Sequence, residues 1–108
     1  MKRLISAICV LFFLLPLSAQ ETYQKETFIS SRGDTLQYRL LQPENMKKSE
    51  KYPLVLFLHG AGERGNDNER QLTHGGQMFL NPVNREKYPA FVLAPQCSET
   101  GYWAYSAR

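Results

Sequence analysis

Two continuous apolar runs, at residues 54–58 and 90–94, are the strongest pattern along the chain. A strand that is covered on both faces of a parallel sheet has this kind of pattern, whereas a half-exposed strand alternates. Each run is introduced by the same Lys-Tyr-Pro tripeptide, and the two copies lie 36 residues apart. That spacing suits one strand–helix–strand unit. The runs therefore predict two parallel buried strands, at about 53–58 and 90–94.

Weaker, alternating patterns come before these runs. Residues 23–30 are mostly polar with a few spaced apolar side chains, and residues 35–41 place Leu36, Tyr38 and Leu40 at every second position. A period of two is typical of a half-buried strand. The cluster at 31–34 contains a glycine, which adopts a positive φ at low cost. We therefore expect an antiparallel hairpin with strands at about 23–30 and 35–41.

The connection between the two apolar runs predicts a broken helix. Residues 67–72 can open a helix with Asn66 or Asp67 as its N-cap. Gly75-Gly76 interrupts that helix, and Asn81-Pro82 can restart a short one that runs to Lys87. Hairpin, parallel strands and crossover together indicate an α/β fold.

The first 20 residues have the order of a secretory signal peptide. Residues 1–3 are positively charged, residues 4–17 are almost entirely apolar, and small or polar residues follow. The apolar stretch has 14 residues, fewer than the roughly 20 that a membrane-spanning helix needs. We expect cleavage after Ala19, export to the periplasm or the extracellular space, and no stable membrane anchor afterwards. An uncleaved anchor is the alternative.

Removing residues 1–19 changes the charge and the length. Lys2 and Arg3 carry two of the three net positive charges of the whole chain, so a partial domain at 20–108 is close to neutral. It contains no basic run with interleaved aromatic residues, which argues against nucleic-acid binding. Cys9 lies in the leader, and Cys97 alone remains. An internal disulfide is thus excluded for residues 20–108.

A glycine-rich loop directly follows the first buried run. It begins at His59, and Gly60, Gly62 and Gly65 match the spacing of the dinucleotide-binding fingerprint. That fingerprint should lead straight into a helix and be followed about 20 residues later by an acidic residue. Here Asn-Asp-Asn follows the last glycine, and the next run ends in Pro-Gln. The context therefore argues against a dinucleotide site.

The same loop fits another family better. The string Pro-Leu-Val-Leu-Phe-Leu-His-Gly-Ala-Gly-Glu-Arg-Gly at 53–65, Leu-Ala-Pro-Gln at 93–96 and Trp103 resemble exported serine esterases of the α/β-hydrolase fold. Within that fold they are similar to polyhydroxybutyrate depolymerases, feruloyl esterases and prolyl-oligopeptidase-like hydrolases. The resemblance covers about half of the chain. It implies that the chain is an amino-terminal fragment of such an enzyme.

The resemblance also implies roles for individual residues. In the α/β-hydrolase fold a strand-end His-Gly loop supplies part of the oxyanion hole. By this resemblance the main-chain N–H of Ala61 is the donor, with that of Gly62 as the less favoured candidate. The remaining assignments are loop-shaping roles for His59, Gly60, Gly65 and Arg64. Tyr102 and Trp103 are candidates for a pocket wall, and packing under a helix is the alternative.

The catalytic triad of the resembled family is missing. Acyl transfer in that fold needs a Ser in a G-x-S-x-G frame, followed by an Asp or Glu and then a His. None of the serines after residue 19 has that frame, and no histidine follows His74. We therefore expect no catalytic residue in this chain and no activity from it alone. The resemblance implies no cofactor, and the spacing of His59 and His74 gives no support for a metal site.

The sequence favours part of an exported serine hydrolase, with an ester more probable than a peptide as substrate. The expected substrate is a small-molecule or polysaccharide-linked ester. A peptidase of the prolyl-oligopeptidase-like group and a small exported binding or accessory module without catalysis are the alternatives. A continuing reading frame that encodes G-x-S-x-G would separate the hydrolase from the module.

Overall fold

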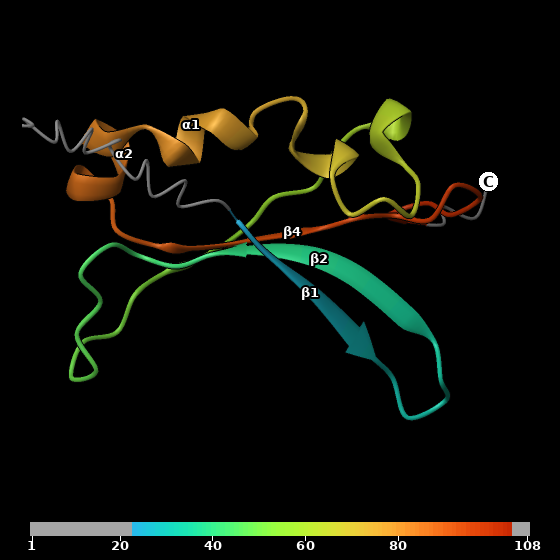
Figure 1. Cartoon of the computed structure of the whole chain (residues 1–108), viewed down its shortest axis with the longest axis horizontal. Helices are drawn as coiled ribbons and strands as arrows, with labels where there is room; N and C mark the ends of the chain where they lie inside the picture. The colour runs from blue at the N-terminus through green and yellow to red at the C-terminus, as the bar shows by residue number, and fades with distance from the viewer. Residues whose placement is uncertain (1–22, 105–108) are drawn as a thin grey trace, which may run out of the picture.

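The computed structural model describes residues 23–104, so the expected signal peptide lies outside the described residues. A four-stranded mixed sheet forms the centre of this part (Figure 1). Its strands are β1 (Gln24–Ile29), β2 (Thr35–Leu41), β3 (Leu54–Leu56) and β4 (Phe91–Pro95), in the spatial order β1-β2-β4-β3. The expected α/β fragment, a hairpin followed by two parallel strands, is confirmed.

The pairing of the strands follows from their connections. β1 and β2 form an antiparallel hairpin whose turn holds Gly33 at a φ of 87°. β2 then pairs antiparallel with β4, and β3 pairs parallel with β4, with Val55 opposite Val92. The regular part of β3 is shorter than the expected 53–58, but pairing continues, because the N–H of Phe57 donates to the carbonyl of Leu93 at 2.9 Å.

The crossover from β3 to β4 is a series of short helical pieces. They are η1 (Ala61–Glu63), η2 (Arg70–Leu72), α1 (Gly76–Leu80) and α2 (Pro82–Lys87). The expected break falls at Gly75, where φ is 92°. The expected restart is also present: the Asn81 side chain accepts hydrogen bonds from Val83 N and Asn84 N, and Pro82 occupies the first helical position. The crossover is therefore broken as predicted, but the helix expected over 67–72 is only the turn η2, and Gly76, expected within the break, begins α1.

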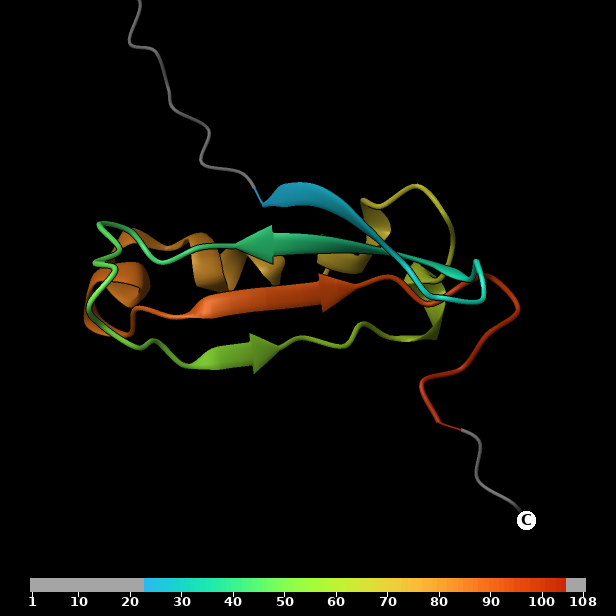
Figure 2. The same cartoon turned by 90° about the horizontal axis from the view of Figure 1, so that it is seen from below.

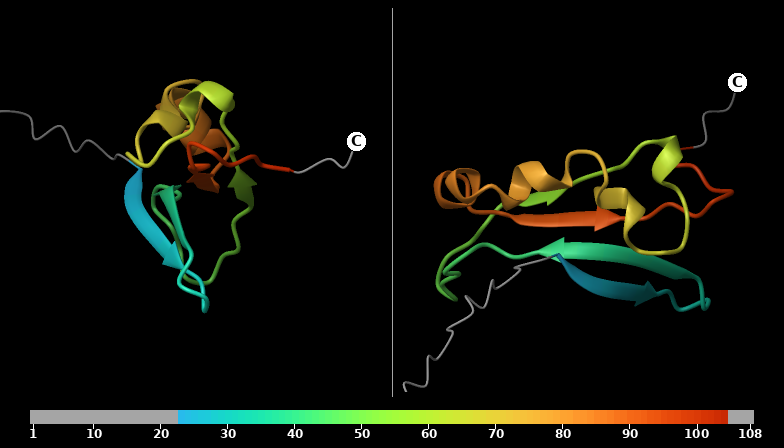
Figure 3. Two further views of the ribbon diagram at one scale, coloured as in Figure 1. Left: turned by 90° about the vertical axis from the view of Figure 1, so that its right-hand side faces the viewer. Right: turned by 45° about the horizontal axis from the view of Figure 1, so that its top comes forward.

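The core lies between the sheet and the helices, which cover one face (Figure 3). Tyr23, Leu41 and Val92 are buried there, and Phe57 and Phe79 pack against them with ring centroids 5.8 Å apart. The other face of β3 and β4 has no described element over it (Figure 2). Leu54 and Leu56 are 64% and 58% exposed on that face. The continuous apolar run is thus the pattern of a strand covered on both faces, but among the described residues only one face of β3 is covered.

An apolar hollow of about 590 Å³ lies between the helices and the amino ends of the parallel strands. Its lining is mostly apolar and comes from β2, β3, β4, α1, α2 and their flanking loops: Leu41, Pro43, Pro53, Val55, Met78, Phe79, Asn84, Arg85, Tyr88, Pro89, Ala90 and Val92. The loop after β3 starts at the opposite end of the same strands. Among the described helices, none is long and apolar enough to cross a bilayer.

Candidate functional site

The candidate site is the loop that leaves the carboxyl end of β3. β3 and β4 run in the same direction, so this loop lies beside the segment that follows β4 (Figure 2). Gly60 is extended, with φ −80° and ψ 179°, and η1 starts at the next residue. Ala61 and Gly62 are exposed. As the first two residues of a helical turn, they have N–H groups that the turn itself does not use.

Both ring nitrogens of His59 are engaged within the protein. The N–H of Cys97 donates to Nε2 at 2.9 Å, and Nδ1 lies 2.6 Å from the Gly60 carbonyl. A main-chain N–H can only donate, so Nε2 is the acceptor and Nδ1 carries the proton. His59 is 6% exposed. In this arrangement the neutral ring ties the loop to the segment after β4, and no ring nitrogen is left for a substrate or a metal.

The two predicted pocket aromatics lie against this loop. Trp103 Nε1 donates to the His59 carbonyl at 2.9 Å, and the two rings meet edge to face with centroids 4.9 Å apart. Tyr102 lies under the Arg64 guanidinium, whose carbon is 5.2 Å from the ring centroid. Both aromatic side chains remain partly open, at 64% for Tyr102 and 40% for Trp103. The structure therefore brings the expected loop and the expected aromatics together.

Arg64 and Gly65, which follow η1, connect the loop to the segment after β4. Arg64 donates from Nε to the Ala61 carbonyl at 3.0 Å and from a terminal nitrogen to the Gly101 carbonyl at 3.2 Å. Gly65 adopts a φ of 153° and donates its N–H to the Cys97 carbonyl at 3.0 Å. These bonds join η1 to the segment that follows β4.

Glu63 folds back over the start of the loop. Its side chain is 16% exposed, and one carboxylate oxygen lies 3.5 Å from Nε2 of the exposed His74. A Cβ atom placed on Gly60 would lie 3.0 Å from the other carboxylate oxygen. A side chain at position 60 would therefore require the flexible end of the Glu63 side chain to shift.

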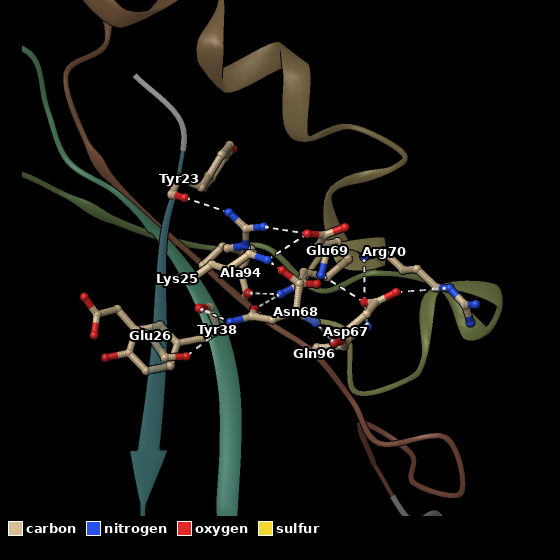
Figure 4. Close-up of polar contacts among 12 residues, drawn as sticks. Tyr23, Lys25, Glu26, Tyr38, Asp67, Asn68, Glu69, Arg70, Ala94 and Gln96 are labelled. Carbon is tan, nitrogen blue, oxygen red and sulfur yellow. Dashed lines mark hydrogen bonds and ion pairs between the residues drawn. The ribbon is translucent and has the colours of Figure 1, made fainter. Parts of the chain in front are cut away.

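A network of amide side chains beneath the loop was not predicted from the sequence (Figure 4). The Gln96 side chain is almost fully buried and bridges Glu63, Asp67 and Asn68. Asn68 in turn donates to the carbonyls of Glu26 and Tyr38 in the hairpin. The available signal was the Leu-Ala-Pro-Gln string at 93–96, which contributes to the resemblance, but that string gives no indication of the partners of Gln96.

Asp67 is the charged member of this network. The N–H groups of Arg70 and Glu69 donate to its carboxylate at 3.1 and 2.9 Å, and Gln96 Nε2 donates at 2.8 Å. These hydrogen bonds lower the pKa of the Asp67 carboxyl from 3.8 to about 2. Asp67 is therefore ionised at neutral pH and is held as an acceptor. Asn66 or Asp67 was the expected N-cap of a helix over 67–72. In the structure Glu69 is the N-cap of the short turn η2, and Asp67 accepts from the N–H groups of Glu69 and Arg70 at its start.

Within residues 23–104, no group of three or more histidine, cysteine or acidic side chains is placed to hold a metal ion. Cys97 is a buried free thiol. The chemistry that the loop itself offers is that of exposed main-chain N–H donors beside aromatic side chains.

Comparison with solved structures connects this arrangement to a known class. The chain matches the crystal structure of a thermostable esterase with a TM-score of 0.72 and 41% sequence identity. The match covers 77% of this chain and 23% of that chain. The described chain is a fragment of an esterase-like hydrolase fold. No protein-family model matches the sequence, and no curated protein matches it significantly.

The chain spans about a quarter of the length of the esterase that it matches. Within this esterase-fold fragment, Ala61 and Gly62 lie between Gly60 and Arg64 in the loop. Trp103 contacts His59 on one side of them, and Tyr102 contacts Arg64 on the other. No described residue completes a serine–histidine–acid arrangement, since the sequence has no serine in the required frame.

Proposed function

We propose that this chain is the amino-terminal part of an exported serine hydrolase that cleaves carboxylic esters. The observation that carries the proposal is the match to a thermostable esterase at 41% identity, together with a strand-end loop that presents unused N–H groups. The substrate class is a small-molecule or polysaccharide-linked ester. The leader at 1–19 would direct export, and amino-terminal sequencing of the exported product should then begin at Gln20.

In the proposed reaction, a serine elsewhere in the complete enzyme attacks the ester carbonyl and forms an acyl-enzyme, which water then hydrolyses. Negative charge develops on the carbonyl oxygen in the tetrahedral transition state. Ala61 N–H, with Gly62 N–H beside it, would donate to that oxygen. A donor that is fixed in place before the reaction stabilises this charge without reorganisation, and loss of one such donor costs about 10²–10³-fold in kcat.

The conformation of the loop permits a sharp test of the Ala61 donor. Ala61 is the first residue of η1, a position where proline is tolerated because its missing N–H is not used by the helix. Gly60 already has the extended conformation that a residue before proline requires. Ala61→Pro should therefore remove the donor while the backbone stays in place. Ala61→Ser, which keeps the N–H, is the matched control.

The measurement is p-nitrophenyl acetate hydrolysis by the product of the longest reading frame that contains this sequence. We expect activity in that product and in Ala61→Ser, and a loss of about 10²–10³-fold in kcat for Ala61→Pro. The purified chain from Gln20 to Arg108 should neither hydrolyse the ester nor react with a fluorophosphonate probe.

Each part of the proposal fails on a different result. Full activity in Ala61→Pro would rule out Ala61 as the oxyanion donor. If the reading frame ended at Arg108 and the purified chain unfolded cooperatively, the protein would be a small binding module, and the hydrolase proposal would be rejected. Ester turnover by the chain alone would show that the nucleophile lies within it.

A further inference from the structure

The side chain of Gln96 holds two parts of the candidate loop at once. Gln96 follows β4 directly and is 3% exposed. Its Nε2 donates to the Glu63 carbonyl at 3.2 Å and to Asp67 Oδ1 at 2.8 Å, while its Oε1 accepts from Asn68 N at 2.7 Å. Glu63 is the last residue of η1. One buried amide thus connects the end of η1 to the segment that precedes η2.

The far side of this connection is fixed to the sheet. Asn68 adopts a φ of 54° and donates through Nδ2 to the carbonyls of Glu26 and Tyr38, at 3.3 and 3.2 Å. The main-chain N–H of Gln96 donates to the Gln37 carbonyl at 2.9 Å. Gln96 is therefore held by β2 through its own backbone and by the hairpin through Asn68.

η1 itself has no buried face, so its orientation depends on the groups that bind it: Arg64 at the Ala61 carbonyl and Gln96 at the Glu63 carbonyl. It is three residues long, none of them is buried, and Gly60 before it makes no side-chain cap. A single turn without a buried face gains no orientation from packing. Its direction is set by the groups that bind its ends, and Gln96 is the buried side chain that binds its carboxyl end.

We infer that Gln96 is a positioning residue for the oxyanion loop, orienting η1 so that Ala61 N–H and Gly62 N–H meet the reacting carbonyl oxygen. This inference rests on the proposed function. Oxyanion donors must lie about 2.7–3.1 Å from the developing charge. A displacement of about 1 Å can cost about 10²-fold in rate. Release of the Glu63 carbonyl would therefore lower transition-state stabilisation without removing any donor.

The polarity of the contacts explains why an amide stands at position 96. Its NH₂ group faces two oxygens, the Asp67 carboxylate and the Glu63 carbonyl, while its oxygen faces the Asn68 N–H. A carboxylate at position 96 would keep the bond from Asn68 N–H but would place oxygen against both of the other partners. An apolar side chain of similar length would lose all three bonds.

The test compares variants of the ester-hydrolysing protein. Gln96→Met keeps the volume and removes every hydrogen bond of the side chain. We expect kcat for p-nitrophenyl acetate to fall about 10–10²-fold with KM nearly unchanged, and affinity for a boronic-acid transition-state analogue to fall in parallel. Gln42→Ala is the control, because Gln42 is exposed and its side chain donates to Gln24 in the hairpin at 3.4 Å.

A carboxylate at position 96 provides a second test. Gln96→Glu should lower kcat at least as far as Gln96→Met, because its carboxylate faces Asp67. Circular dichroism and thermal unfolding of each variant establish that it is folded.

The outcomes separate this inference from the proposed function. If the wild-type protein has no esterase activity, the proposed function is wrong. A wild-type protein that is active, with a folded Gln96→Met variant whose kcat and analogue affinity equal the wild type, overturns the positioning role alone. A fall in kcat together with a rise in KM and a loss of thermal stability would assign Gln96 a structural role instead and would also overturn the inference.

Discussion

The Tyr23 hydroxyl group joins the residue before β1 to the helical layer. It is buried and donates to the Gly76 carbonyl at 3.0 Å. Burial raises the pKa of Tyr23 from 10.0 to about 12, and the nearby Arg85 opposes that rise. The neutral phenol is therefore the form that the folded chain accommodates.

Because Tyr23 is buried as a neutral phenol, the free energy of unfolding should decrease at alkaline pH. The pKa of Tyr23 is higher in the folded chain than in the unfolded chain, so its contribution is fully present below pH 10 and is lost as the pH rises towards 12. Tyr23→Phe should abolish that part of the alkaline loss and should cost about 1 kcal/mol at neutral pH, because the Gly76 carbonyl loses its donor. Urea unfolding of both chains at neutral and alkaline pH measures this. Identical alkaline profiles would contradict it.

Some residues of the candidate site can be predicted from the sequence, and others cannot. The glycine-rich loop and the aromatics at 102 and 103 were located from the sequence because they carry a motif. The partners of His59 were not, because they come from Cys97 and Trp103, about 40 residues away. Gln96 belongs to the Leu-Ala-Pro-Gln string of the resemblance, but that string assigns it no role, and a buried amide is recognised only when the groups around it are in place.

Elements were predicted best where the hydrophobic pattern is continuous. The two apolar runs gave β3 and β4, and the period of two gave β2. The helix expected at 67–72 shortened to the three residues of η2. The reason is tertiary: Asn68 takes a left-handed conformation so that its side chain can bond to β1 and β2, which a helical residue could not do.

The break in the crossover at Gly75 leads to a prediction about this element. Its φ is 92°, and a Cβ atom there would lie 3.1 Å from the Phe57 ring. Gly75→Ala should lower the free energy of unfolding by about 1–3 kcal/mol, because it adds left-handed strain and a contact with a core ring. Urea unfolding gives the value.

Gly33→Ala is the matched control for that variant. Gly33 has a similar φ of 87°, but a Cβ atom there would meet nothing within 4 Å. It should therefore show the strain of about 1–2 kcal/mol without the contact. Equal losses in the two variants would mean that Phe57 moves aside freely and that packing adds nothing at Gly75.

At the scale of the whole molecule, the described residues form a sheet with helices on one face, while the other face and the outer edge of β3 are uncovered. β3 is the edge strand of the sheet, and within residues 23–104 no strand pairs with its outer side. Leu54, Leu56 and Leu58 are 64, 58 and 46% exposed beside that edge. The matched esterase is about four times as long as the matched segment, which agrees with a sheet that other parts of a longer protein would extend and cover.

An unpaired edge next to exposed leucines should make the purified chain associate with itself. We expect the chain from Gln20 to Arg108 to form dimers and larger species as its concentration rises, as measured by sedimentation velocity. Leu56→Lys should shift it towards monomer, because a charge on this face opposes contact between sheets. Val83→Lys is the control, since Val83 is 68% exposed but lies on α2, in the helical layer. If both variants reduce association equally, general hydrophobicity rather than the open sheet drives the association.

The opposite outcome would be a wild-type chain that stays monomeric at high concentration. It would show that water can cover the unpaired edge of β3 and its exposed leucines. The structural reason for expecting a larger parent protein would then be lost.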